Sequence, residues 1–109
     1  MATVVLHSRL RPGHETDYDR DHVVIPEGLV SSFARVGIHD WTIWRSGLDL
    51  FHLVECDDFT AAMTALEDDP ANLPWQAFIG RHVPHFIGDE QYGPMPRPQA
   101  WNLGAQRGQ

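Results

Sequence analysis

Two neighbouring segments, each rich in β-branched and aromatic residues, constrain the fold of this chain most strongly. They span 38–45 and 49–56, and Ser46-Gly47 stands between them, where a tight turn belongs. Apolar runs of this length joined by a short glycine-containing linker predict a β-hairpin, so we expect an antiparallel sheet. Because side chains alternate between the two faces of a strand, we expect Trp41 and Trp44 on opposite faces.

The remaining segments predict one further strand on each side of the hairpin and several helices. Before the hairpin we expect a strand over 3–10 and a helix between His14 and Gly37 that is interrupted near Pro26. After the hairpin we expect a helix that is capped by Asp57 or Asp58 and ended by Pro70. A short helix that starts at Asn72 or Pro74 and a strand over 82–87 complete the order. This is the βαββαβ order of a ferredoxin-like α+β fold, an antiparallel sheet with helices on one face.

The length of 109 residues fits one domain. We assign this domain to residues 1–88, and a Pro/Gly-rich C-terminal arm to residues 89–109. The sheet face without helices would carry Trp and Phe side chains and needs a cover. A second copy of the chain could provide it, so we expect a homodimer.

Composition argues against several classes of partner. The formal net charge is −7 and all eight cations are arginine, without a basic cluster for nucleic acid or an anionic membrane. No stretch approaches the ~20 apolar residues of a membrane span. Cys56 has no second cysteine to pair with, and the first residues show no pattern of a signal peptide. We therefore expect a cytoplasmic protein.

The segment 14–26, HETDYDRDHVVIP, holds the candidate site. Tyr18 and His22 are four residues apart and would share one helix face, with His14 one turn earlier. A helical Pro26 would leave the carbonyl group of residue 22 without a donor, so we expect a kink beside His22. On its own, the pattern also fits an acidic, exposed helix face that ends at a proline.

The acidic neighbours of His22 bear on its protonation. Asp19 and Asp21 are close in sequence and would favour the imidazolium, so we expect them to raise the pKa of His22. A histidine that titrates near neutrality is suited to general acid–base work.

The chain resembles the L-rhamnose mutarotase family over residues 3–87. The resemblance rests on RPGHETDYDRDH from residue 11, GIHDWTIW from Gly37, the acidic turn at 55–58 and the helix that carries Trp75. It implies a ferredoxin-like dimer that exchanges the α and β anomers of L-rhamnose, or of L-fucose as in some relatives, without a metal or redox cofactor. By position, His22 would be the proton donor, and Tyr18, Trp41 and Trp75 would line the monosaccharide.

Two departures from the family pattern bear on the sugar. Trp41 stands where tyrosine is frequent, and Gln76 replaces the second tryptophan of a Trp-Trp pair. The resemblance therefore places Gln76 among the substrate-binding residues and leaves the preferred deoxyhexose open.

Three other readings remain. Seven histidines suggest a metal site, and His7, His39 and His52 could converge on neighbouring strands, but no HxH or HExxH spacing occurs. We therefore expect no metal ligands. The same sheet plan also serves cofactor-independent monooxygenases of the dimeric α+β barrel type, which would show an apolar, aromatic-binding pocket. A non-catalytic sugar-binding module is the third reading.

Overall fold

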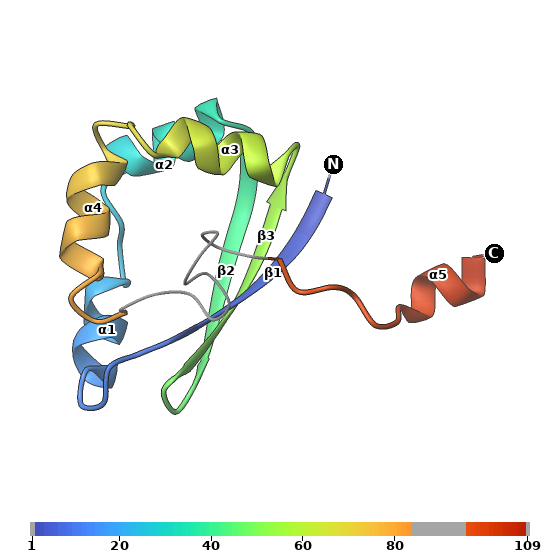
Figure 1. The fold of residues 1–109 in the computed structure, drawn as a ribbon, viewed down its shortest axis with the longest axis horizontal. Helices are drawn as coiled ribbons and strands as arrows, with labels where there is room; N and C mark the ends of the chain where they lie inside the picture. The colour runs from blue at the N-terminus through green and yellow to red at the C-terminus, as the bar shows by residue number, and fades with distance from the viewer. Residues whose placement is uncertain (1, 84–95, 109) are drawn as a thin grey trace.

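The computed structural model describes residues 2–83 and 96–108, and its centre is an antiparallel sheet (Figure 1). The described strands are β1 (Ala2–Arg9), β2 (Ile38–Ser46) and β3 (Asp49–Cys56), in the order β1-β3-β2. β3 is antiparallel to both neighbours, and Gly47 takes the positive φ of 61° that its turn requires. The predicted hairpin is confirmed, and the strand order fits the first three strands of the βαββαβ plan.

The helices are α1 (Glu15–Asp21), α2 (Glu27–Arg35), α3 (Phe59–Leu66), α4 (Asn72–Ile79) and α5 (Leu103–Gly108). Figure 1 shows α1 to α4 on one side of the sheet, whereas α5 lies beyond β1, away from them. None of the helices in the described residues is long and apolar enough to cross a membrane.

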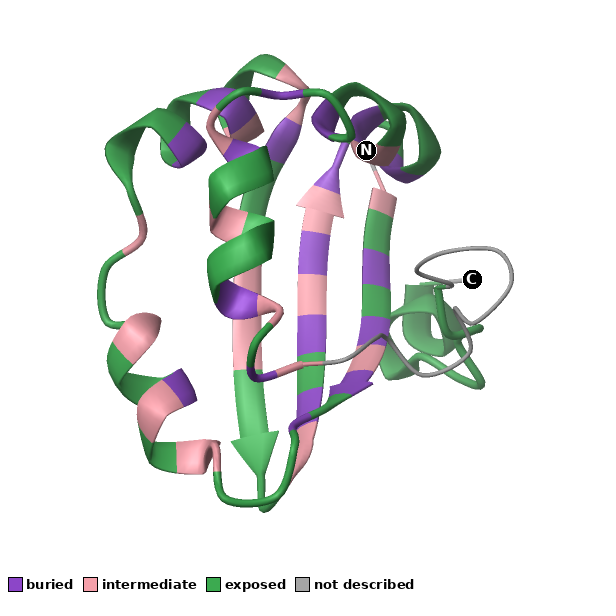
Figure 2. Ribbon diagram, turned by 60° about the vertical axis from the view of Figure 1, so that its left-hand side comes forward, coloured by how far each residue is buried: buried purple, intermediate pink, exposed green. Residues whose placement is uncertain are grey.

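The sheet face toward the helices forms the core. Leu6, Leu50 and Val54 are at most 1 % exposed. Figure 2 shows that buried positions alternate along β3 with positions of intermediate or full exposure. The opposite face stays open: Trp44 is 54 % exposed and Phe51 is 41 % exposed. Trp41 and Trp44 thus lie on opposite faces, as predicted.

A kinked helix through Pro26 was expected, and this prediction is wrong. α1 ends at Asp21 with His22 as its C-cap, and α2 begins after Pro26. Pro26 has extended backbone angles (φ −58°, ψ 139°) and is the N-cap of α2. A proline disfavours helical geometry in the residue before it, so the chain leaves the helix after α1 and starts a new one at Glu27.

The predicted strand over 82–87 is also absent from the part of it that the structure describes. Arg81 and His82 form a turn and Val83 is not in a strand, while residues 84–87 lie outside the described residues. The N–H of His82 donates to the carbonyl of Ile79, which continues the turn of α4 and leaves this backbone unavailable to the sheet.

The predicted boundary between domain and arm, at residues 88 and 89, lies outside the described residues. Within the arm, the Arg97 N–H donates to the carbonyl of Val5 on β1 at 2.8 Å. The arm then ends in α5, a helix that the sequence did not predict.

Asp69 joins α2 to the start of α4. Its Oδ1 accepts from the Ser32 hydroxyl at 2.8 Å and from the N–H groups of Ala71 and Asn72 at 2.9 and 3.1 Å. Its Oδ2 accepts from the Arg35 guanidinium at 2.6 Å. One buried carboxylate therefore supplies the acceptors that the first turn of α4 lacks and fixes this helix beside α2.

Candidate active site

Four rings from α1 and α4 meet at the C-terminal end of α1. The Tyr18 and His22 ring centroids are 4.2 Å apart. The ring centroids of His22 and Trp75 are 5.2 Å apart in a T-shaped contact, and those of Trp75 and Phe78 are 5.8 Å apart. The structure therefore brings together three of the five predicted site residues, Tyr18, His22 and Trp75.

The hydrogen bond of His22 fixes its neutral tautomer. Its Nδ1 lies 3.3 Å from the Tyr18 carbonyl oxygen. Because a carbonyl oxygen only accepts, Nδ1 carries the hydrogen atom and Nε2 keeps a lone pair. Among the described residues, no hydrogen bond engages Nε2, so this nitrogen is available to a ligand.

The pKa of His22 is lowered, against the sequence-based expectation. Burial of the half-buried ring is the largest cause, and it outweighs the hydrogen bond to Tyr18 and the charge of Asp21, which act in the opposite direction. Both acidic neighbours are engaged elsewhere: Asp19 accepts two hydrogen bonds from Arg45 at 2.9 and 2.7 Å, and Asp21 accepts one from His82 at 2.8 Å. At neutral pH, His22 is therefore an uncharged proton acceptor.

Tyr18 is the most buried of the four rings. It packs with Leu10, Leu50 and Ile79, and burial, with the nearby charge of Asp19, raises the pKa of its hydroxyl well above the ordinary value. The phenol therefore stays protonated and can donate a hydrogen bond to a ligand oxygen.

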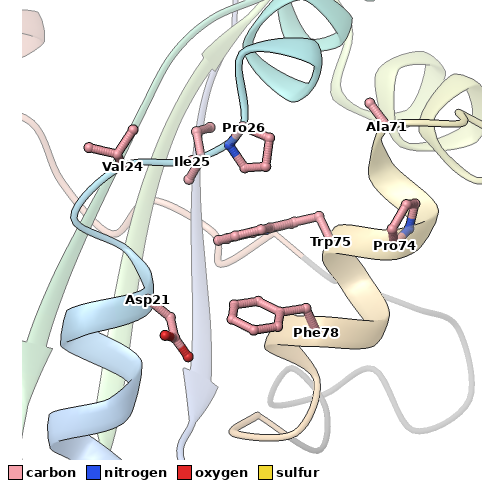
Figure 3. Close-up of a pocket in the computed structure, with 8 residues that line it drawn as sticks. All are labelled: Asp21, Val24, Ile25, Pro26, Ala71, Pro74, Trp75 and Phe78. Carbon is pink, nitrogen blue, oxygen red and sulfur yellow. The ribbon is translucent and has the colours of Figure 1, made fainter.

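A cavity of about 640 Å³ opens beside the ring cluster, between the end of α1, the segment 22–26 and α4. Figure 3 shows Trp75 and Phe78 extending from α4 toward α1. The lining is apolar except for one carboxylate, and its residues are Asp21, Val24, Ile25, Pro26, Ala71, Pro74, Trp75 and Phe78. Of the predicted site residues only Trp75 lines it. The lining residues Val24, Ile25 and Pro26 escaped the sequence analysis because the segment 22–26 was taken for part of a kinked helix.

Trp41 lies on the sheet, in a second group of polar contacts. Its Nε1–H donates to Nδ1 of His52 at 3.1 Å, and its ring stacks on Phe33 at 5.7 Å. Because Nδ1 of His52 accepts, its Nε2 carries the hydrogen atom and donates to the Ser8 hydroxyl at 2.9 Å. Burial, together with the charges of His22 and His7, lowers the pKa of His52 to about 4.

Gln76 is exposed on α4, and its amide donates to the Asn72 side chain at 3.1 Å. It is not among the residues that line the cavity. His82 was not predicted to have a role, yet it is only 3 % exposed and contacts both Asp21 and His14. An isolated histidine after a helix gave no sequence signal for this arrangement.

The histidines considered for a metal site do not converge. His7 faces Asp49 and stacks on Phe51 on the open sheet face, His52 is buried on the inner face, and His39 pairs with Asp57. Within residues 2–83 and 96–108, no group of three or more His, Cys, Asp or Glu side chains is placed to hold a metal ion.

Two solved structures resemble this fold over nearly its whole length. An L-rhamnose mutarotase from Formosa agariphila superposes with a TM-score of 0.71 at 15 % identity, covering 94 % of this chain and 99 % of that one. Tetracenomycin F2 cyclase from Streptomyces glaucescens, a type-II polyketide cyclase, gives a TM-score of 0.66 at 13 % identity, covering 94 % and 98 %. The protein therefore has an α+β fold of the dimeric α+β barrel type, with the ferredoxin-like plan predicted from the sequence.

The family model of L-rhamnose mutarotase matches residues 3–102. The chain belongs to the L-rhamnose mutarotase family, so the resemblance noted in the sequence is confirmed. No curated protein sequence matches the chain significantly. Membership of this family supports an isomerase-type enzyme that acts as a sugar mutarotase.

Proposed function

We propose that this protein interconverts the α and β anomers of a deoxyhexose pyranose, L-rhamnose or L-fucose, with His22 as the group that moves the proton. The supporting observation is that, in a chain of this family, a neutral imidazole lies between Tyr18 and Trp75 with a lone pair on Nε2. Such a group accepts and returns a proton near neutral pH.

The reaction needs one proton removed and one supplied. Nε2 of His22 takes the proton of the anomeric hydroxyl, the C1–O5 bond breaks, and O5 receives a proton as the aldehyde forms. Rotation about C1–C2 exposes the other aldehyde face, and the reverse transfers close the ring. The hydroxyl oxygen and O5 are bonded to the same carbon atom, so one imidazole can serve both. In this proposal His22 is a base before it becomes the donor that the family resemblance implies.

The aromatic surroundings suit the apolar parts of a deoxy sugar. Trp75 presents a broad ring, and a methyl edge or C–H face can lie against it. Tyr18 can donate one hydrogen bond to a hydroxyl oxygen. We also propose that Trp41 and Gln76 contact the sugar, as the family resemblance implies, although Gln76 would first exchange its bond to Asn72.

Saturation-transfer NMR on a panel of L-rhamnose, L-fucose and D-glucose tests this function. We expect accelerated exchange for one or both 6-deoxy sugars, and little acceleration for D-glucose. Equal acceleration for all hexoses would show that the aromatic rings do not select a methyl edge. No acceleration for any sugar would contradict the function.

The apolar cavity favours a second candidate, the binding of an aromatic ligand by a cofactor-independent monooxygenase. Seven of the eight residues that line the cavity are apolar, which is the lining that this alternative predicts. Oxygen consumption with hydroxylated polycyclic aromatics, measured in an oxygen electrode, separates the two. Oxygen uptake together with unchanged sugar exchange would favour the monooxygenase.

We further propose that the protein is a homodimer through its open sheet face. This face presents Val5, Phe51 and Trp44, which are 41, 41 and 54 % exposed, and apolar surface of this kind favours burial against a second copy. Light scattering after size exclusion should give twice the 12.4 kDa chain mass. Phe51→Glu should yield the single chain, and a wild-type particle of ~12 kDa at micromolar concentration would contradict the dimer.

We place the reaction in the cytoplasm. Cys56, the one cysteine of the chain, is a buried free thiol, as expected for a reducing compartment. Fractionation of the source cells, followed by detection with an antibody, tests this placement.

A further inference from the structure

The carboxylate next to His22 in the sequence is held by a histidine from another part of the chain. Asp21 Oδ2 accepts from Nε2 of His82 at 2.8 Å. Arg81 also donates to this oxygen at 3.2 Å, and Arg20 lies 3.4 Å from Oδ1. The side chains of Asp21 and His82 are only 9 and 3 % exposed, so water weakens this pairing little.

A second histidine orients His82. Because a carboxylate accepts, Nε2 of His82 carries a hydrogen atom toward Asp21. Its Nδ1 lies 2.9 Å from Nδ1 of His14, so one proton lies between the two rings. The Arg11 N–H also donates to the His82 carbonyl at 2.8 Å. The ring of His82 is therefore held at both nitrogens and its backbone is held by Arg11, with the Nε2–H directed at Asp21.

The other acidic neighbour of His22 is held differently. Asp19 pairs with Arg45 of β2 at the surface, where its side chain is 51 % exposed. On the sheet side of His22 the titratable group is the buried His52, whose pKa is lowered in part by the charge of His22. Of the two carboxylates beside His22, only Asp21 is shielded from solvent, so its partner matters most to the site.

We propose that His82 is a positioning residue for His22: its hydrogen bond occupies the Asp21 carboxylate, and the neighbouring imidazole thereby stays neutral and able to accept a proton. The proposal rests on the role of His22 proposed above. It gives a role to His82, a nearly inaccessible histidine that does not line the cavity. The charge of Asp21 raises the pKa of His22, and His82 lowers it.

NMR titration of the His22 ring protons in the full chain tests this inference, with the signal assigned by its loss in His22→Gln. In His82→Leu the carboxylate loses its shortest hydrogen bond and keeps only the longer contacts with Arg81 and Arg20. We therefore expect the His22 midpoint to rise by about one pH unit. His82→Gln keeps an N–H donor and should titrate close to wild type. Arg45→Gln is the matched control, because it releases the exposed Asp19, and should shift the midpoint much less.

An unchanged His22 midpoint in folded His82→Leu would overturn the inference. If this variant does not fold, Asp21→Asn decides: with the carboxylate engaged by His82, the midpoint should fall by less than about half a pH unit. A larger fall would show that the His82 hydrogen bond does not restrain the effect of the Asp21 charge on His22. Exchange rates distinguish this proposal from the proposed catalytic role of His22. If the His22 midpoint rises in His82→Leu but the pH profile of exchange does not move, His82 controls the protonation of His22, and His22 is not the catalytic group.

Discussion

His22 is half-buried and His52 is buried, and burial lowers the pKa of both histidines, but their surroundings differ in one decisive respect. His52, on the inner sheet face, is held at both ring nitrogens by Ser8 and Trp41. His22, at the end of α1, is held through Nδ1 alone among the described residues. Burial makes both rings neutral at pH 7, but only His22 keeps a nitrogen available for proton transfer. Desolvation alone therefore does not identify a catalytic histidine.

The largest effect is expected when the available ring nitrogen of His22 is removed. We expect His22→Ala to slow anomer exchange by about 10²-fold or more, while the melting temperature changes little, because the ring lies outside the two core clusters. His39→Ala removes an exposed histidine that pairs with Asp57 and should exchange at the wild-type rate. If His22→Ala also exchanges at that rate, the assigned site is wrong and the fold alone is shared with the family.

Lowering the pH should reduce the stability of the folded chain through the protonation of His52. The folded-state pKa of His52, about 4, lies below its ordinary 6.5. The unfolded chain therefore binds the proton first, and stability falls as the pH drops from 6.5 toward 4, by about 3 kcal/mol. Urea unfolding at several pH values measures this loss. His52→Gln should lack this component, and an identical pH dependence in the variant would assign the loss to other groups.

The pH profile of exchange sharpens the assignment of His22 as a base. Its pKa is lowered, mainly by burial, so the acceptor form predominates at pH 7. We expect a rate that is level at neutral and mildly alkaline pH and falls about tenfold per pH unit below the His22 pKa. A rate that instead falls as the pH rises through 6 to 7 would show that the protonated ring limits the reaction.

The smallest expected effect belongs to Tyr18. Tyr18→Phe keeps the ring that packs on His22 and removes one hydrogen bond of roughly 1 kcal/mol, so exchange should slow about fivefold. Exchange kinetics with saturating sugar measure it. A loss of a hundredfold would show that the phenol itself transfers a proton.

Local patterns predicted most of this fold. The apolar runs around Ser46-Gly47 placed the hairpin, and the capping and proline signals placed the helices that cover the sheet. The prediction was wrong at Pro26 and after α4, where single residues decide between continuing and leaving a helix. The Tyr18–His22 pair followed from helical spacing, and the family resemblance added Trp75.

The electrostatics of the site could not be read from sequence spacing. Asp19 and Asp21 are neighbours of His22 along the chain, which suggested a raised pKa. Their partners, Arg45 and His82, come from β2 and from the turn after α4. Such pairings arise only when distant segments pack, and burial, the largest influence on His22, is a property of the whole fold.

Because Asp69 is an acceptor shared by several groups, substitutions at the positions that contact it should be linked in this family. Ser32, Arg35 and the start of α4 all bond to this one carboxylate, so their contributions to stability cannot be independent. A relative that lost the carboxylate would leave the Ser32 hydroxyl buried without this acceptor, and replacement at both positions together would be less harmful than the sum of the two single changes. Positions 32 and 69 should therefore covary among related chains, and a double-mutant cycle between them should show a coupling energy of about 1 kcal/mol.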